Sequence, residues 1–128
     1  MSNSIGNIAI HVSDLATAEH FYTETLGLDV RTRIDTPTVA EVIVGAADGR
    51  GSALMLAFAK GTGAAPAPSG IWKIFVETDD VPALYAAALA AGSTSIMEPT
   101  RLEQFRVTIA MVTDPDGYVV ELGQVEPR

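Results

Sequence analysis

The chain begins with alternating apolar and polar residues over positions 5–12, which predicts a β-strand. A helix should follow, because Asp14 stands where an N-terminal cap belongs and Gly27 stands where such a helix would end. The apolar stripe of this helix comprises Leu15, Ala18, Phe21, Tyr22 and Leu26. Strands are predicted at 29–34, 39–44 and 53–58, separated by the turn-forming stretches "DTP" and "GAADGRGS".

The second half of the chain predicts the same order of elements. Residues 71–78 form a strand, Asp80 caps a helix with Pro82 in its first turn, and Gly92 ends it. Three strands then follow, at residues 94–97, 106–112 and 118–123. The stretch "EPTRLEQF" at 98–105 is interpreted as a polar loop.

An internal repeat relates the two halves. The segments "NIAIHVSDL" and "KIFVETDDV" both end near a capping aspartate, and Asp14 and Asp80 are 66 positions apart. The same shift relates Asp48 to Asp114, Gly51 to Gly117 and Met55 to Glu121. We therefore predict an α+β chain of two tandem βαβββ modules, at about 5–58 and 71–123. A Gly/Ala/Pro linker at 59–70 joins them, and the 128 residues form a single domain, 1–128.

Alternation along the first and last strand of each module separates two faces. One face is entirely apolar and should pack under the helices: Ile8, Ile10, Val12, Leu54, Leu56, Phe58, Ile74, Val76, Val120 and Leu122. The other is mixed: Asn7, Ala9, His11, Ala53, Met55, Ala57, Lys73, Phe75, Glu77, Val119, Glu121 and Gly123. Apolar walls with a few polar groups are typical of a ligand cleft, so we expect a curved mixed sheet that encloses a cleft, with the helices outside.

Composition narrows the possible partners and location. The formal net charge of −8 argues against nucleic acid or an anionic membrane as a partner. There is no cysteine, which excludes disulfides and thiolate metal sites. No apolar run is long enough to span a bilayer, and the N-terminus lacks a signal-peptide pattern, so a cytoplasmic location is predicted.

Two motifs in this frame are familiar. "DLATAEHFYTETLGL" after the first strand and "DPDGYVVEL" near the end resemble the vicinal oxygen chelate superfamily, which includes glyoxalase I, bleomycin-resistance proteins and extradiol dioxygenases. The resemblance covers nearly the whole chain. It implies that metal-dependent members hold a divalent cation with His, Gln or Glu at four cleft positions. In this chain those positions are Asn7, Met55, Lys73 and Glu121, and only Glu121 matches the pattern.

The residue types at these positions argue against a metal. A hard divalent ion needs several oxygen or imidazole donors, whereas Met55 offers a thioether and Lys73 an ammonium group. We expect neither metal nor another cofactor, and a Lys73–Glu121 ion pair in the place of the ion. A displaced site built from His11, Glu121 and either Glu77 or Asn7 is an alternative, but its spacing fits no standard short metal motif.

The remaining candidates leave several roles open. The residues predicted to contact a ligand are Asn7, His11, Met55, Lys73, Phe75 and Glu121. Met55 and Phe75 would stack against a flat or apolar ligand, or would only fill the cleft. Glu121, Lys73 and His11 are the best catalytic candidates, although His11 is better explained as a hydrogen-bonded wall residue.

Two functional classes follow from the sequence. The first is a binding protein that sequesters a small organic ligand, cationic or aromatic, as bleomycin-resistance proteins do; the resemblance also implies a homodimer. The second is a lyase, isomerase or dioxygenase, either metal-free through Glu121, Lys73 and His11 or with rearranged metal ligands. A direct ion pair stabilises both charged forms and so opposes proton transfer by either partner. Whether any chemistry is catalysed, and on which substrate, is left open by the sequence.

Overall fold

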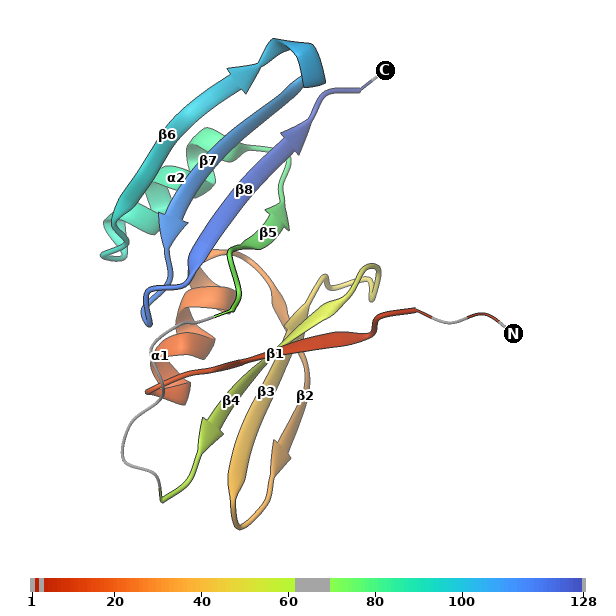
Figure 1. Ribbon diagram of the computed structural model, residues 1–128, viewed down its shortest axis with the longest axis vertical. Coiled ribbons are helices and arrows are strands. Elements are labelled where there is room, and N and C mark those ends of the chain that lie inside the picture. The colour runs from red at the N-terminus through yellow and green to blue at the C-terminus, as the bar shows by residue number, and fades with distance from the viewer. Residues whose placement is uncertain (1, 3, 62–69, 128) are drawn as a thin grey trace. The chain divides into compact units, whose positions relative to one another are not determined.

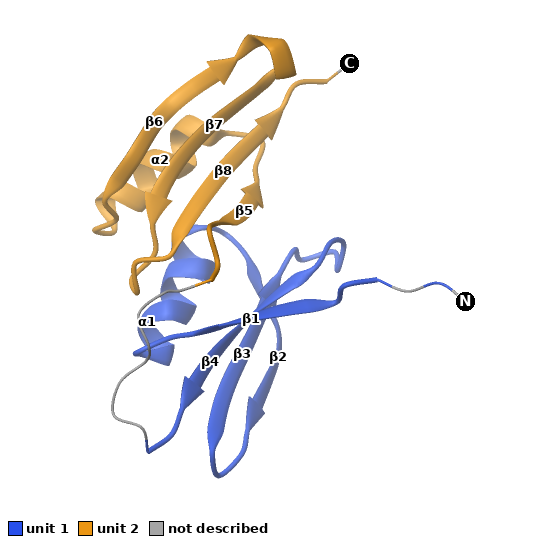
Figure 2. Cartoon of the chain, viewed as in Figure 1, with its two compact units in different colours: residues 1–67 blue, residues 68–128 orange. Residues whose placement is uncertain are grey.

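The computed structural model describes residues 2, 4–61 and 70–127 of the chain. These residues belong to two compact units, Met1–Ala67 and Pro68–Arg128 (Figure 2). The division falls within the predicted linker, most of which (residues 62–69) lies outside the described residues. Each unit is described by itself below.

The first unit has one four-stranded mixed sheet. Its elements are β1 (Asn7–His11), α1 (Leu15–His20), the π-helical turn η1 (Phe21–Thr25), β2 (Asp29–Asp35), β3 (Val39–Gly45) and β4 (Ala53–Ala59). The strand order is β1-β4-β3-β2, with β1 parallel to β4 and the other neighbours antiparallel (Figure 1). The predicted cap of the helix is present, since Asp14 accepts a hydrogen bond from the Thr17 amide at 2.8 Å.

The first helix ends in a wider turn than its sequence pattern predicts. In η1 the amide of Leu26 donates to the carbonyl of Phe21, five residues earlier, at 2.9 Å. Phe21 and Tyr22, although consecutive, are both buried, and their rings meet edge to face at 5.2 Å. An ordinary α-helix would separate such neighbours by about 100° around its axis, so the wider turn places both aromatic rings in the core.

The second unit repeats this plan. Its elements are β5 (Ile74–Glu77), α2 (Val81–Ala90), β6 (Ser95–Leu102), the 3₁₀ turn η2 (Glu103–Phe105), β7 (Val107–Thr113) and β8 (Val119–Val125). The strand order is β5-β8-β7-β6, again with a parallel pair at one edge, and α2 lies across one face of the sheet (Figure 1). Asp80 caps α2 by accepting from the Ala83 amide at 3.0 Å, with Pro82 in the first turn as predicted.

Strand register confirms the internal repeat. Ala9 pairs with Met55 across β1 and β4, and Phe75 pairs with Glu121 across β5 and β8. Both pairs obey the offset of 66 residues found in the sequence. The prediction of an α+β chain built from two tandem βαβββ modules is therefore confirmed.

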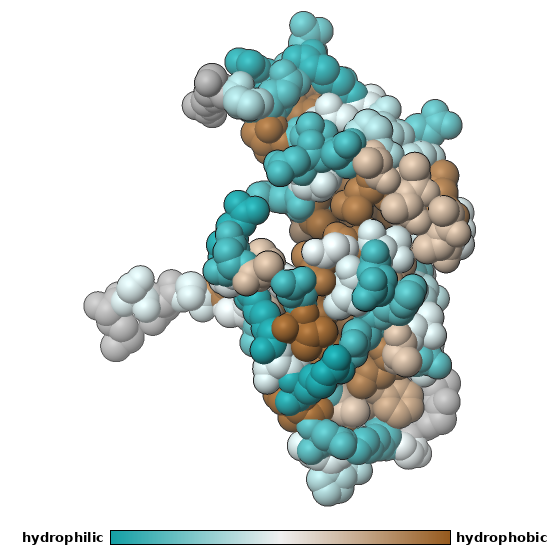
Figure 3. Space-filling view, turned by 180° about the vertical axis from the view of Figure 1, so that it is seen from behind, coloured by the Kyte–Doolittle hydropathy of each residue, from teal (hydrophilic) through white to brown (hydrophobic). Residues whose placement is uncertain are grey.

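The core of each unit lies between its helix and the apolar face of its sheet. The fully buried side chains include Val12, Tyr22, Val44 and Leu56 in the first unit and Val81, Val112, Val120 and Leu122 in the second. Ile8 departs from the prediction: it shares the apolar face but is 53% exposed, because β1 is an edge strand. Apolar residues also reach the surface in patches bordered by polar ones (Figure 3). Among the described residues, no helix has the length and apolar character needed to cross a bilayer.

The turn before the last strand is held by a buried carboxylate. Oδ1 of Asp114 accepts hydrogen bonds from the amides of Asp116 and Tyr118, each at 2.9 Å. Asp114 is itself buried, so these bonds satisfy a charge that would otherwise be costly to enclose. The turn thereby fixes where β8 begins, and with it the position of Glu121.

The prediction of a polar loop at residues 98–105 is wrong. β6 continues to Leu102, and the 3₁₀ turn η2 follows it. Register shifts between Ser95 and Met97, and again between Met97 and Thr100, break the period-two pattern by which a strand is recognised in sequence. Pro99 is tolerated because β6 is an edge strand.

Candidate functional site

Lys73 and Glu121 form an ion pair in the second unit, as predicted. Glu121 lies within β8, and Lys73 immediately precedes β5, the parallel neighbour of β8. The Glu121 side chain is only 8% exposed, whereas that of Lys73 is 26% exposed. A carboxylate this buried needs a compensating charge, and Lys73 supplies it.

The ion pair is made through a buried oxygen of the carboxylate. The ammonium of Lys73 contacts Oε1 of Glu121 directly. The same ammonium lies 4.0 Å from the centre of the Trp72 ring, which is a cation–π distance. Lys73 is thus held between a carboxylate and an aromatic face.

Phe75 lies directly over Gly123. A Cβ atom at position 123 would stand 2.2 Å from Cζ of Phe75 and 2.8 Å from Cε2, so a larger residue there would push the ring aside. Phe75 remains 49% exposed. Glycine in a strand interior often marks a place where another group comes close to the backbone. Here it lets the Phe75 ring lie against the sheet beside Glu121.

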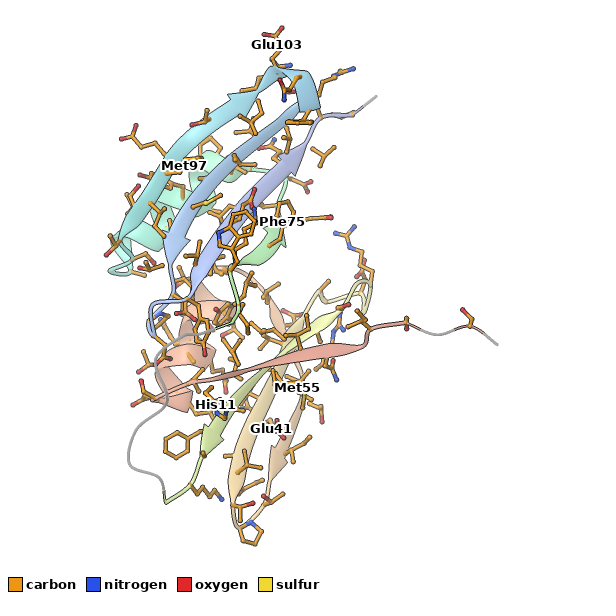
Figure 4. All side chains as sticks on the ribbon, in the orientation of Figure 1. His11, Glu41, Met55, Phe75, Met97 and Glu103 are labelled. Atoms are coloured by element: carbon orange, nitrogen blue, oxygen red, sulfur yellow. The ribbon has the colours of Figure 1, made fainter. Side chains whose placement is uncertain are left out.

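These residues belong to a row that crosses the second sheet. Phe75 pairs with Glu121, Glu121 with Met111, and Met111 with Met97, one residue from each of the four strands. Paired residues point to the same face, which is opposite the one under α2 because Val120 and Leu122 are buried there. Phe75 and Met97 mark the two edges of the row in Figure 4. We call Phe75, Glu121, Met111 and Met97 the cross-sheet row.

Met111 and Met97 were missed as candidate residues. The period-two pattern places Met111 on one face of its own strand, but it does not state which residue of β8 lies opposite. For Met97, the bulges in β6 also hide the alternation. Only strand pairing brings these two thioethers into line with Glu121.

In the first unit the predicted residues lie on one face but do not converge. Asn7 pairs with Ala53, Met55 with Ala9 and His11 with Ala57, so the three occupy successive positions along β1 and β4. Asn7 and His11 are four residues apart on one strand, which is roughly 13 Å at the usual rise. They therefore cannot both contact one small group within this sheet.

A carboxylate that the sequence analysis did not single out, Glu41, shares the face of His11 two strands away. Ala57 pairs with His11 on one side and with Glu41 on the other, so the three residues cross β1, β4 and β3 on the same face. Figure 4 shows His11, Met55 and Glu41 on these three strands. The period-two pattern of β3 alone gave no reason to single out Glu41.

The candidate residues divide between the units. Asn7, His11 and Met55 belong to the first, and Lys73, Phe75 and Glu121 belong to the second. That both groups line one shared cleft stays a prediction of the sequence.

The four positions that hold a metal in metal-dependent relatives do not fit one here. The single carboxylate among them, Glu121, is already paired with an ammonium, and Met55 offers a soft sulfur. Over the described ranges 4–61 and 70–127, no cluster of three His, Asp or Glu side chains is arranged to hold an ion. We derive no chemistry through a metal at these positions.

Comparison with known proteins identifies the class. Residues 4–122 match the model of the glyoxalase/bleomycin resistance protein/dioxygenase superfamily. The chain belongs to this superfamily, and the resemblance seen in its motifs is confirmed.

The similar proteins are described with different functions. A probable lactoylglutathione lyase from Vibrio parahaemolyticus is 32% identical over 129 residues, covering 97% of this chain and 93% of that protein. Glyoxalase I of Leishmania major has a TM-score of 0.80 at 28% identity, with 94% and 86% of the two chains covered. TnmS3, an antibiotic binding protein from Streptomyces, has a TM-score of 0.75 at 26% identity, with 98% of each chain covered. The chain spans only 44% of a relative from Brassica oleracea var. gemmifera, at 28% identity over 124 residues.

Proposed function

We propose that this protein binds a small organic ligand on the mixed faces of its sheets and does so without a metal ion. The single observation that supports this most strongly is the Lys73–Glu121 ion pair. It places a positive charge on the one carboxylate that a cation would need. The residues assigned to the ligand remain those predicted from the sequence: Asn7, His11, Met55, Lys73, Phe75 and Glu121.

The character of the second-unit face also supports binding. Phe75 and the methionines of the cross-sheet row offer apolar contact area, and the Lys73–Glu121 pair places polar groups beside it. Such a combination is typical of small-molecule sites. TnmS3, described as an antibiotic binding protein, matches 98% of the chain, so a small-molecule binding protein has a precedent in this fold.

A second candidate function is favoured by the curated relatives. The Vibrio parahaemolyticus protein is described as a probable lactoylglutathione lyase, and the Leishmania major structure as a glyoxalase I. An enzyme of this kind would need either rearranged metal ligands or metal-free acid–base chemistry by Glu121, Lys73 and His11. The ion pair opposes the metal-free route, because each charged partner stabilises the other.

Metal analysis combined with an activity assay distinguishes the two candidates. Protein purified without chelator should contain no stoichiometric metal, and added nickel or zinc should not induce turnover of the methylglyoxal–glutathione hemithioacetal. Native mass spectrometry of the same preparation should reveal a bound small organic molecule. Stoichiometric metal, or turnover that depends on it, would refute the proposal.

The metal-free enzyme requires a separate measurement. Any turnover found in metal-free buffer should be abolished by Glu121→Gln while the circular dichroism spectrum stays unchanged, if Glu121 transfers a proton. We expect no such turnover.

A homodimer and a cytoplasmic location complete the proposal. Analytical ultracentrifugation measures whether the protein is a homodimer.

A further inference from the structure

We infer that Arg31, on the mixed face of the first unit, recognises a carboxylate group of the small organic ligand. This inference rests on the proposed function and specifies the chemical class of the ligand. It depends on three observations about the Arg31 guanidinium group: it has no counter-ion, it lies on the candidate ligand face, and one of its nitrogens reaches solvent.

Arg31 differs from the other basic residues in lacking a counter-ion. The chain has 16 acidic and 8 basic residues, so carboxylates are plentiful. Among the described residues, every other lysine and arginine forms an ion pair with a carboxylate. Arg31 forms none, not even with Asp29, which pairs with Gly45 in the strand register. A half-buried guanidinium group without a counter-charge costs free energy, and the carboxylate of a ligand would recover it.

The guanidinium group lies on the mixed face of the first sheet. A Cβ atom at position 45 would stand 2.5 Å from Cζ of Arg31 and 2.6 Å from Nε, so the group covers the backbone of Gly45. Positions 43 and 45 point to one face of β3 because they are two residues apart, and Ile43 pairs with Met55 of β4. Met55 is one of the residues assigned to the ligand. The uncompensated charge and the candidate ligand face therefore coincide.

A β-bulge in β2 explains this position of the side chain. Val30 pairs with Val44 and Thr32 pairs with Ile43, which leaves Arg31 as the extra residue between two paired positions. Such a bulge changes the direction of a side chain, and bulges are common beside functional sites. The period-two pattern of β2 gave no indication of it, so the sequence did not single out Arg31 as a candidate.

Hydrogen bonds fix the guanidinium group and leave one nitrogen open. Nη2 donates to the carbonyl of Arg50 at 2.9 Å and to that of Ala46 at 3.5 Å. Nε is buried and has no acceptor among the described residues. Nη1 also makes no hydrogen bond within the described ranges, but it is not one of the buried polar atoms, so it reaches solvent. A ligand therefore meets a charged donor at Nη1 whose orientation is already fixed.

The charge of the site favours a carboxylate over a phosphate. One guanidinium group carries one uncompensated positive charge, which a single negative charge neutralises. A phosphate monoester carries about 1.5 to 2 negative charges at pH 7, and a chain of net charge −8 would repel the excess. Met55, partly exposed on the same face, offers apolar contact to the carbon skeleton of an organic acid.

Three benzene derivatives of different charge test the inference: benzoate, its neutral analogue benzamide, and phenyl phosphate. Titrations of the full-length chain, followed by backbone amide NMR, should show benzoate binding about tenfold more tightly than benzamide. Phenyl phosphate should bind no more tightly than benzoate. The largest shift changes should fall on residues 31, 45 and 55. Added salt should weaken the binding of benzoate but not that of benzamide, because only the first depends on charge.

Matched variants assign the preference for benzoate to Arg31. Arg31→Gln should bind benzoate and benzamide equally, whereas Arg31→Lys keeps the charge and should retain part of the preference. Arg33→Gln is the control on the same strand: Arg33 is already paired with Glu19, so its loss should leave the preference unchanged. Circular dichroism shows whether each variant is folded. If Arg31→Gln is not, Gly45→Ala replaces it, since the new Cβ displaces the guanidinium group and should reduce the preference.

The results that would overturn the inference differ in what else they affect. If benzoate and benzamide bind equally, if phenyl phosphate binds more tightly than benzoate, or if Arg31→Gln keeps the preference, the ligand class is wrong while metal-free binding stands. A co-purifying molecule without a carboxylate has the same meaning. If no probe binds and no molecule co-purifies with the protein, the proposed function fails as well.

Discussion

The Lys73–Glu121 pair makes a quantitative prediction about stability. Replacing Lys73 by Met keeps the length and the apolar stem of the side chain but removes its charge. The Glu121 carboxylate, 8% exposed, is then left without a counter-charge. Breaking a fully buried pair in this way costs about 3–5 kcal/mol; because Lys73 is 26% exposed and water can partly replace it, we expect about 2–3 kcal/mol.

The other two variants of this double-mutant cycle, Glu121→Met and Lys73→Met/Glu121→Met, should behave differently. Glu121→Met leaves an ammonium that can turn towards water and keep its Trp72 contact, so the cost should be about 1 kcal/mol. Lys73→Met/Glu121→Met removes both charges together and should be within about 1 kcal/mol of the unmodified protein, or more stable. The double variant should therefore be more stable than Lys73→Met alone, which is the signature of coupling.

Urea unfolding provides the measurement. The chain contains one tryptophan, Trp72, so its fluorescence reports the neighbourhood of the pair, while far-ultraviolet circular dichroism reports both units. If the two transitions coincide, unfolding is two-state and the free energy of unfolding can be derived from them. If Lys73→Met unfolds at the same urea concentration as the unmodified protein, or if the double variant is no more stable than Lys73→Met, the buried pair is not as we describe it.

Three further predictions concern the scaffold. Gly123→Ala should cost about 1 kcal/mol, because the new Cβ collides with the partly exposed Phe75 ring, and adding Phe75→Ala should remove the steric part of that cost in urea titrations. Asp114→Ala should cost about 2 kcal/mol by leaving the Asp116 and Tyr118 amides without their acceptor, whereas Asp114→Asn should cost clearly less in thermal unfolding. Arg33 lowers the pKa of Glu19 below the usual glutamate value of 4.5, chiefly through a hydrogen bond. The stabilisation is therefore present above pH 4.5 and lost as the pH falls through the lowered pKa. Arg33→Gln should thus narrow the difference between the urea midpoints at pH 7 and pH 3, and an unchanged difference would contradict this assignment.

Much of the fold could be predicted because its signals are local. The alternation in each strand, the capping residues Asp14 and Asp80 and the stops at Gly27 and Gly92 each lie within a few positions of what they determine. The offset of 66 residues then supplied the one non-local fact that was needed, because a repeated unit must pair its strands in a repeated way. Lys73 and Glu121 followed from that repeat, and their ion pair is confirmed.

The failures of prediction have equally physical causes. The bulged strand β6 was mistaken for a loop because each register shift resets the alternation of its side chains. The π-helical turn could not be anticipated, since a helix pattern does not say where one extra residue is accommodated. Neither feature changes the amino-acid composition of its segment, so neither can be recognised from the sequence.

The sequence by itself determined which residues share a strand face, and hence that Glu121 lies away from the helix and beside an ammonium group. Only the tertiary structure decided what surrounds that carboxylate: the Phe75 ring beside Gly123 and the methionines across the sheet. The reason is that side-chain alternation is a property of one strand, whereas the contacts between strands depend on their register. Register is set by turns, bulges and packing over the whole module.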